Sequence, residues 1–410
     1  MKRSWKRNFY ILWVAELVAI IGFQAIQPFL PYYIQQLDVE SLDEALLWAG
    51  YMGTAGGLAM ALSAPVWGAV ADRWGRKPMV VRSMLGGGLT VLGLAYASSA
   101  EQVLVLRTLQ GLLAGTVTAC ITLVSTSTPR AHQAFALGLM QGAFMLGGAV
   151  GPFFGGIAIE RFGYHYSLLG GGLLVLLAGV VVWVFVHEDF TRPQRRGGQS
   201  TWRGFYEDSR QLLRGRAYRI LLLCLVLMQF SFGVVIPIVP LFLQQLSGSA
   251  DILSQAGSIF ALAGLAGALA SVFTGKVSER YGARRTLVVG LLITALFFAG
   301  QGMATSVVML GALIVVGSLV TGGLRPVLFG LVAQVVPEDA RGKAFGLMTS
   351  ASALGWALGP GLGGNIGAVW GFPPVFFGTA VLFIFVALWS GWALQGISQP
   401  AAAADSKGKG

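Results

Sequence analysis

The chain has 410 residues, of which 55% are hydrophobic and only 11% are charged, and its mean hydropathy is +0.71. A soluble domain usually carries about 25% charged residues, so this composition excludes an ordinary soluble protein. The net charge of +11 could suggest a nucleic-acid partner, but the basic residues are distributed in another way, described below. The 58 glycines are typical of packed transmembrane helices, whose backbones approach closely at small residues.

The first apolar stretch, residues 8–34, is long enough to span a bilayer, which takes about 20 apolar residues as a helix. It is too long for a signal peptide and lacks a small-residue cleavage site, so we expect a retained helix. Glu16 stands about 12 Å into this helix, at 1.5 Å per residue. An ionised carboxylate there costs at least about 2.5–3.5 kcal/mol unless it is protonated, paired or hydrated. We therefore interpret Glu16 as functional; the alternative is an acid that faces a polar cavity only for packing.

Hydropathy predicts twelve spans, an even number that places both termini on one side of the membrane. The predicted spans are residues 9–34, 46–67, 79–98, 103–127, 135–158, 167–186, 218–243, 255–274, 286–304, 307–333, 344–367 and 375–396.

The basic residues orient these spans. On the side of the termini lie 25 of the 28 Lys and Arg residues, and the exceptions are Arg107, Arg161 and Arg325. Basic residues accumulate on the cytoplasmic side, so we expect a multi-pass protein of the plasma (inner) membrane with cytoplasmic termini.

Glu16 is the one acid well inside a predicted span, because the other 16 acids fall in loops or at the ends of spans. Cys120 and Cys224 fall inside apolar segments, and the three histidines have no metal-ligand spacing. We therefore expect no disulfide framework, no metal and no cofactor.

Three blocks of sequence recur at offsets of 207–209 residues and predict two related halves. Residues 28–37 return at 237–246, 68–77 at 275–285, and 147–156 at 355–364. The predicted domains are a six-helix bundle over 1–186, a cytoplasmic linker with an interfacial helix over 187–217, a second bundle over 218–397, and a disordered tail over 398–410.

Three motifs carry a resemblance to a known family. The segment Gly68-x3-Asp72-Arg73-x-Gly75-Arg76-Lys77 resembles the loop signature between helices 2 and 3 of the major facilitator superfamily. The segment Leu106-Arg107-x2-Gln110-Gly111 resembles that family's helix 4 signature, and Gly147-x3-Gly151-Pro152 resembles the helix 5 motif of its drug/proton antiporters. The resemblance implies an all-α membrane protein with twelve transmembrane helices in two pseudo-symmetric six-helix bundles.

The resemblance also implies a role for Glu16. Some multidrug exporters of this group carry an acid twelve residues before a proline in helix 1, as Glu16 stands before Pro28. Such an acid would recognise cationic drugs and couple their export to protons. Where a second helix 1 acid can occur, this chain has Gln24, so the proton stoichiometry does not carry over.

The loop signature has a physical interpretation of its own. Asp72 could sit against the positive N-terminal end of a helix in the other half, which would make the loop a latch between the halves. The alternative is an ordinary positive-inside loop, and the repeat of the segment argues against it. The latch residues are Gly68, Asp72, Arg73, Gly75 and Arg76, with Glu279 and Arg280 in the repeat.

Arg107 never deprotonates, so it must be paired or hydrated, and we expect it to face the cavity and adjust the protonation of Glu16. The alternative is a structural arginine. For Arg325, which precedes Pro326, both interpretations stay open. The small-residue faces predict close, sliding helix packing, with the interfaces between the halves on spans 46–67 and 255–274. The packing residues are Gly147, Gly151, Pro152, Gly355, Gly359 and Pro360.

These features predict a proton-driven exporter of amphipathic, preferably cationic, drugs, in which a cationic drug displaces the proton on Glu16. Aromatic and Met residues would bind such compounds by stacking and cation–π contacts. The candidate substrate-binding residues are Trp13, Glu16, Phe23, Gln24, Met140, Phe144, Phe232 and Trp356.

The alternative within transport is a lipid or glycolipid flippase, or a sugar or metabolite exporter. An enzyme is disfavoured, because no His, Cys or paired acids converge inside the spans. The expected partners are small lipophilic substrates and membrane lipids, without nucleic acid, and we expect a monomer.

Overall fold

The computed structural model describes residues 4–188, 190, 210–248 and 252–395. All regular structure in these residues is helical. The α-helices are α1 (Ser4–Gln24), α2 (Leu30–Tyr33), α3 (Leu42–Trp74), α4 (Lys77–Leu94), α5 (Ala100–Leu112), α6 (Thr116–Ser127), α7 (Arg130–Phe185), α9 (Arg216–Val235), α10 (Ile238–Ser247), α11 (Ile252–Tyr281), α12 (Ala283–Gly302), α13 (Val307–Val335), α14 (Arg341–Trp370) and α15 (Phe372–Ala393).

These helices make twelve passages through the fold. The pairs α1 and α2, α5 and α6, and α9 and α10 each form one passage in two pieces, whereas α7 forms two. The division of α7 falls at Gly163, whose φ of +74° lies outside the helical region and favours glycine. Among the described residues, nine helical segments are individually long and apolar enough to cross a membrane. The all-helical, twelve-span prediction is confirmed.

The structure corrects two of the predicted spans. The helix predicted over 46–67 is much longer, since α3 continues to Trp74 and carries the loop signature on its last turns. The span predicted over 103–127 is broken between α5 and α6, where Gly115 has a φ of +121°. Most of the predicted linker and interfacial helix, and the whole of the predicted tail over 398–410, lie outside the described residues.

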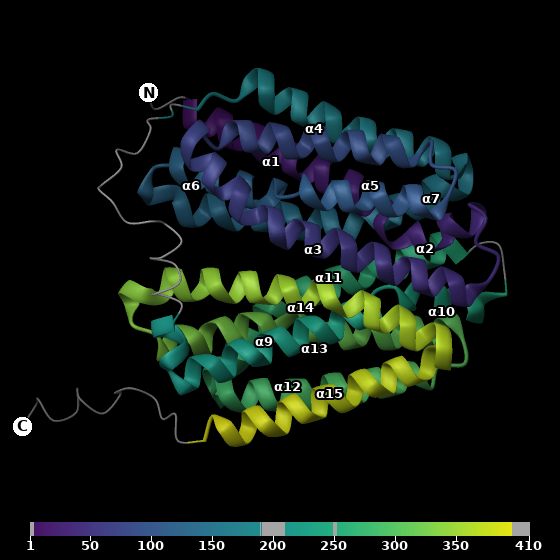
Figure 1. The fold of residues 1–410 in the computed structure, drawn as a ribbon. Coiled ribbons are helices and arrows are strands. Elements are labelled where there is room, and N and C mark those ends of the chain that lie inside the picture. The colour runs from purple at the N-terminus through teal and green to yellow at the C-terminus, as the bar shows by residue number, and fades with distance from the viewer. Residues whose placement is uncertain (1–3, 189, 191–209, 249–251, 396–410) are drawn as a thin grey trace, which may run out of the picture.

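Each half is held together by its own helix pairs. In the first half α1 and α4 pack on α7, and α3 packs on α5; in the second half α9 packs on α14, α11 on α13 and α12 on α15. The halves meet where α3 packs on α14 and where α7 packs on α11. Figure 1 shows the first half above the second, with the start of α1 and the end of α15 at the same end of the molecule.

Contacts between the halves concentrate at the end opposite the termini. A Cβ added at Gly53 would lie 2.7 Å from Pro360, and one at Gly57 would lie 2.7 Å from Ala357. On the other seam, a Cβ at Gly264 would lie 2.9 Å from Ala149. Side chains at these glycines would therefore force the halves apart.

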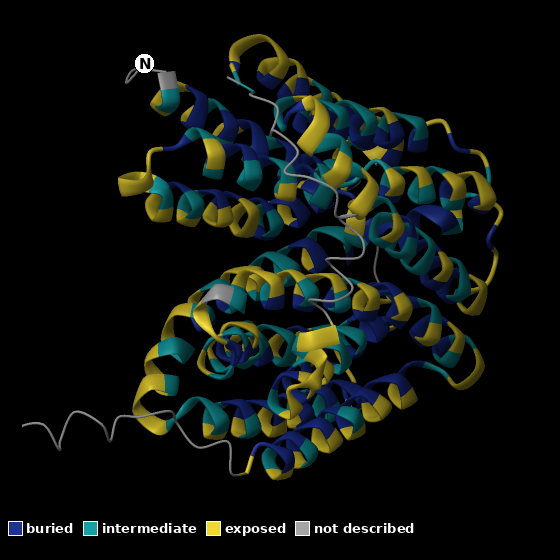
Figure 2. Ribbon diagram, turned by 60° about the vertical axis from the view of Figure 1, so that its left-hand side comes forward, coloured by how far each residue is buried: buried dark blue, intermediate teal, exposed yellow. Residues whose placement is uncertain are grey.

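Toward the termini the halves separate. A Cβ added at Gly68, Gly142, Gly275 or Gly346 would find no atom within 4 Å. In Figure 2 the ribbons of the two halves converge at one end and diverge toward the end that carries the N-terminus. The structure is therefore a state that is closed at one end and open at the end of the termini.

The break between α5 and α6 is held by two neighbouring helices. Trp67 Nε1 of α3 donates to the Leu112 carbonyl oxygen at 2.7 Å, and Arg82 Nη2 of α4 donates to that of Ala114 at 3.1 Å. The Arg82 guanidinium also lies 3.6 Å from the centroid of the Trp67 ring. Arg82, which in sequence looks like one more cytoplasmic base, thus satisfies a carbonyl freed by the break.

Candidate functional site

Glu16 is completely buried on α1, with an exposed fraction of 0%. Its neighbours belong to an apolar cluster that α1 forms with α6 and α7, in which Cys120 and Met140 are also fully buried. Neither carboxylate oxygen has a hydrogen-bond partner among the described residues. Glu16 therefore lies deep inside the first helix, as expected, and its carboxyl group is enclosed by packed side chains.

Most predicted substrate-binding residues near Glu16 take part in the packing of α1 on α7. Trp13 Nε1 donates to the Leu139 carbonyl oxygen at 3.0 Å. The Gln24 side chain runs past α7, where its Cβ would lie 2.8 Å from a Cβ added at Gly151. Met140 is fully buried in the same seam. Trp13 and Gln24 of α1 and Met140 of α7 thus lie where these two helices pack together.

Two of the predicted aromatic residues lie away from the space between the halves. Phe23 points at α4, where the tip of its ring would be 2.6 Å from a Cβ added at Gly87. Phe232 packs inside the second half, with ring centroids 6.1 Å from Phe298 and 5.4 Å from Phe383. Both side chains are packing residues in this state. Their direction around the helix has no clear signal in sequence, because both faces of these helices are apolar.

Phe144 and Trp356 are more accessible, with exposed fractions of 38% and 40%. Phe144 lies on α7 and Trp356 on α14, and each of these helices packs on a helix of the other half. Both precede the residues at which these helices make close contact, Ala149 and Ala357, on the side of the termini. They are the predicted substrate-binding residues that remain available where the halves separate.

Arg107, expected to face the cavity and adjust the protonation of Glu16, makes a local bond on its own helix. Its Nη1 donates to Gln110 Oε1 on the same helix, while its Nε has no partner among the described residues. Its backbone carbonyl oxygen would lie 3.2 Å from a Cβ at Gly56 of α3. Arg325 lies with its guanidinium 5.6 Å from the centroid of the Phe329 ring, one turn along α13.

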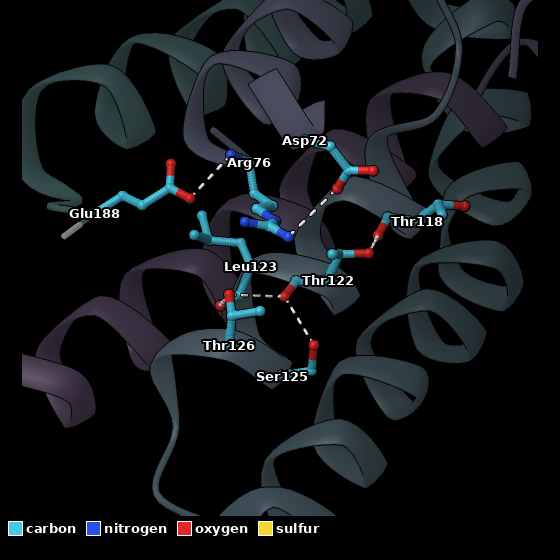
Figure 3. A network of polar contacts seen from close by, with 8 residues as sticks. All are labelled: Asp72, Arg76, Thr118, Thr122, Leu123, Ser125, Thr126 and Glu188. Atoms are coloured by element: carbon cyan, nitrogen blue, oxygen red, sulfur yellow. Dashed lines mark hydrogen bonds and ion pairs between the residues drawn. The ribbon is translucent and has the colours of Figure 1, made fainter. Parts of the chain in front are cut away.

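The loop signature between α3 and α4 is bound to the end of α7. Glu188 Oε1 accepts from Arg76 N at 2.9 Å and Oε2 accepts from Lys77 N at 2.7 Å, so this carboxylate caps α4 (Figure 3). Gly75, with a φ of +102°, would place a Cβ only 2.8 Å from Glu188 Oε2. Glycine is favoured there by the backbone conformation, and a larger residue would also push against the capping carboxylate. The capping role of Glu188 was missed, and its only sequence signal is an acid just after a span.

The predicted latch residue Asp72 contacts only its own half. Its Oδ1 lies 3.5 Å from Arg76 Nη2, and 71% of its side chain is exposed. In the repeated segment, Glu279 is exposed, and Arg280 lies 5.4 Å from the centroid of the Tyr281 ring. The hydroxyl groups of α6 in the same view bond to carbonyl groups of their own helix (Figure 3). The two loop segments are therefore disengaged from each other in this open state.

The opposite end is closed by polar contacts that sequence reasoning missed. Gln35 Nε2 donates to Gln244 Oε1 at 2.9 Å, and Gln244 Nε2 donates back to Gln35 Oε1 at 3.1 Å. These two residues occupy equivalent positions in the repeat, which was the signal available. Glu160 Oε1 of α7 accepts from Ser254 N in the first turn of α11 at 2.7 Å. A carboxylate at a helix N-terminus is favourable, so Glu160 helps to hold the halves together.

The small-residue motifs serve two different contacts. Gly151 faces α1, where a Cβ would lie 3.1 Å from the Ile21 carbonyl oxygen, and Gly359 faces α9 in the same way. Pro152 and Pro360 lie on the seams with the other half, next to Gly257 and Gly53. The prediction that Gly147, Gly151, Gly355 and Gly359 provide close packing fits this geometry, but their partners are α1 and α9 of their own half. The interfaces predicted for spans 46–67 and 255–274 are the observed ones, α3 and α11.

A family model for the Major Facilitator Superfamily matches residues 12–264 and 221–409, which is nearly the whole chain. The chain belongs to the major facilitator superfamily. Its fold, its twelve passages and its repeated halves fit that membership, which indicates a multi-pass membrane transporter rather than an enzyme.

Among characterised sequences, the chain is similar to proteins named for drug resistance. It is 29% identical over 393 residues to the multidrug resistance protein MdtG of Yersinia enterocolitica, covering 96% of this chain and 94% of the relative. It is 30% identical over 390 residues to a multi-drug resistance efflux pump PmrA homolog of Lactococcus lactis, covering 94% and 95%.

Solved structures agree on the fold. The nucleoside transporter NupG has a TM-score of 0.77 at 15% identity, with 95% of this chain and 99% of that one covered. A bacterial homolog of the human lysosomal transporter Spinster, in an inward-facing and unoccupied conformation, has a TM-score of 0.73 at 15% identity, covering 96% and 97%.

Proposed function

We propose that this transporter exports amphipathic, preferably cationic, compounds across the plasma membrane in exchange for protons. Relatives that cover almost the whole chain are named as multidrug resistance or efflux proteins, which supports the substrate class. The observation that supports the proton coupling is the buried carboxyl group of Glu16, which has no hydrogen-bond partner among the described residues. Energy would come from the proton gradient, without a cofactor.

The burial of Glu16 suggests its chemistry. A carboxylate without a partner in an apolar pocket is costly, so in this state the group is best accommodated as the neutral acid. A cationic compound that opens the seam between α1 and α7 would favour the carboxylate, because it supplies the missing opposite charge. Glu16 then holds either the proton or the cation but not both, which is the requirement for exchange.

Alternating access would follow from the two ends of the molecule. In this structure the end with Gln35 and Gln244 is closed and the end with the termini is open. With cytoplasmic termini, as the basic residues predict, this is an inward-open state. Closing the inner end would bring Asp72, at the end of α3, toward the start of α14, since these helices already pack at their other ends. The exposed Asp72 of the open state is compatible with a latch that forms only when the inner end closes.

Substrates would enter from the open end. Phe144 and Trp356 are half-exposed on the two helices that pack against the other half, α7 and α14. Both could offer a ring face to a lipophilic cation. Met140 of α7 is fully buried in the same apolar cluster as the neighbours of Glu16, so a compound that reaches it would have to separate α1 from α7. Trp13 and Gln24 of α1 are partly exposed and could be reached without that movement. Arg107, bonded to Gln110, could affect Glu16 through movement of its helix rather than by direct contact.

The proposal is tested by ethidium accumulation in cells that express the wild-type protein or Glu16→Gln. The wild type is expected to keep accumulation low, and a protonophore should abolish the difference from cells that lack the protein. Glu16→Gln keeps the shape of the side chain but cannot titrate, and it should accumulate ethidium like those cells. Unchanged export by Glu16→Gln would contradict the proposed role of the carboxyl group, and wild-type export that resists the protonophore would contradict proton coupling.

A further inference from the structure

A groove runs between α12 and α15 at the end of the molecule that carries the termini. It has a volume of about 600 Å³, and its apolar wall includes Val289 and Leu388, which are more than half exposed. At its end stand two arginines and an exposed Trp. The lining residues used below are Arg284, Arg285, Val289, Leu388, Trp392 and Gln395.

The two arginines differ in their contacts. Arg284 Nη2 donates to the Gly391 carbonyl oxygen near the end of α15, which holds this guanidinium at the edge of the groove. Arg285 is exposed and has no hydrogen-bond or ion-pair partner among the described residues. The groove therefore offers positive charge without a counterion from the described part of the chain.

The internal repeat shows what such a position binds. In the first half, the Glu188 carboxylate caps α4 through the backbone N–H groups of Arg76 and Lys77. The offset of 207 residues relates Lys77 to Arg284, but the offset is 208 residues from the third block onward, so Glu188 is related to Gly396. No side chain of the described residues caps the first N–H groups of α12, and the residue in the position of Glu188 is a glycine. The second half thus lacks the anion that the first half supplies, but it keeps two basic residues, Arg284 and Arg285.

We propose that this groove binds the headgroup of an anionic phospholipid from the surrounding leaflet. The phosphate would lie against Arg284 and Arg285, in the half that has no counterpart of the Glu188 carboxylate. An acyl chain would lie along the exposed Val289 and Leu388, and Trp392 would stand at the level of the headgroups, where this residue type is enriched. Basic pockets between transmembrane helices on the cytoplasmic side are suited to such headgroups. The inference is independent of what the protein transports.

The test measures lipid retention by the purified full-length protein in detergent, by native mass spectrometry after addition of phosphatidylglycerol or phosphatidylcholine. The wild type is expected to retain phosphatidylglycerol preferentially. Arg285→Gln should lower that retention about fivefold, the effect of one basic residue near an anionic membrane surface. Gln395→Glu should also lower it, because a carboxylate in the groove would compete with the phosphate for the two arginines. Lys276→Gln is the matched control, an exposed base at the same end outside the groove, and should retain lipid like the wild type.

Three results would overturn the proposal. The first is equal retention of both lipids by the wild type, and the second is wild-type retention of phosphatidylglycerol by Arg285→Gln and Gln395→Glu. The third is displacement of the lipid by glycerol 3-phosphate at equal concentration, which would identify a site for soluble phosphate compounds rather than for a lipid.

Discussion

At the scale of single residues, two carboxylates at opposite ends of the molecule differ in their engagement. Glu160 accepts from the backbone of α11 and so joins the two halves, whereas Asp72 contacts only Arg76 of its own half. A carboxylate at a helix N-terminus is worth about 0.3–1 kcal/mol when exposed. Each acid can therefore shift the balance between the two open states without determining it alone.

Replacing Glu160 with Gln is expected to favour opening of the end that is closed here. The neutral amide loses the interaction with the positive end of α11, a change of up to about fivefold in the ratio of the two states. Spin labels on the outer ends of α7 and α11 should report a larger population of long distances. Glu101→Gln is the control, since Glu101 is an exposed acid at the same end in the first turn of α5. Identical distance distributions in wild type and Glu160→Gln would show that this bond does not contribute to closure.

Asp72→Asn is expected to act in the opposite direction. It removes the charge that would meet the other half when the inner end closes, so the inward-open state should gain population and transport should fall sharply. Expression and thermal stability should stay near those of the wild type, because the Asp72 side chain is mostly exposed here. Wild-type rates of efflux from this variant would reduce the loop to a determinant of topology.

At the scale of helices, the small residues on α7 and α14 divide into two stripes. One stripe packs within its own half, and the other packs on the opposite half. A Cβ at Gly156 would overlap the Leu253 carbonyl oxygen of α11, and one at Gly364 would overlap that of Leu46 of α3. Only the second stripe separates when the transporter changes state, so only it should control the closed end.

Gly156→Leu should therefore hold the closed end open, since a leucine cannot fit against the α11 backbone. We expect cysteines introduced at the outer end of the seam to become reactive to a membrane-impermeant thiol reagent added outside the cells. Gly170→Leu is the matched control, because a Cβ there meets no atom within 4 Å. Equal reactivity in Gly156→Leu and the wild type would show that the close approach of α7 and α11 is not needed for closure.

The sequence predicted the number and position of the helices better than it predicted which side of each helix packs against which neighbour. The number of passages followed from hydropathy and from the repeat, and the seams of α3 and α11 followed from their small residues. The break at Gly115 could not be predicted, because a glycine inside a span has no local signal and the freed carbonyl groups are satisfied by Trp67 and Arg82 from other helices. Likewise, Phe232 packs inward because its partners Phe298 and Phe383 lie there.

At the scale of the whole molecule, the two halves share a plan but differ where chemistry is needed. Glu16 has no acidic counterpart in the second half, since its repeat position, offset by 209, is Leu225. The isolation of Glu16 was therefore predictable from the sequence. Its apolar surroundings were not, because they depend on how α6 and α7 pack against α1. If Glu16 exchanges protons as proposed, this asymmetry places the exchange in the first half.

The proposed orientation is tested by tags on the two termini. Because the sequence places 25 of the 28 basic residues in predicted segments on the side of the termini, neither tag should bind an antibody added to intact cells. Both tags should become accessible after permeabilisation. Labelling of both tags on intact cells would reverse the orientation and convert this structure into an outward-open state.

The central claim is that a cationic substrate and a proton compete through Glu16. The most direct measurement is the release of protons from purified protein in weak buffer when a lipophilic cation such as ethidium is added, over about pH 6–8. The wild type is expected to release protons, and Glu16→Gln to release none even where it still binds the compound, as judged by ethidium fluorescence. Proton release from Glu16→Gln equal to that of the wild type would contradict the claim.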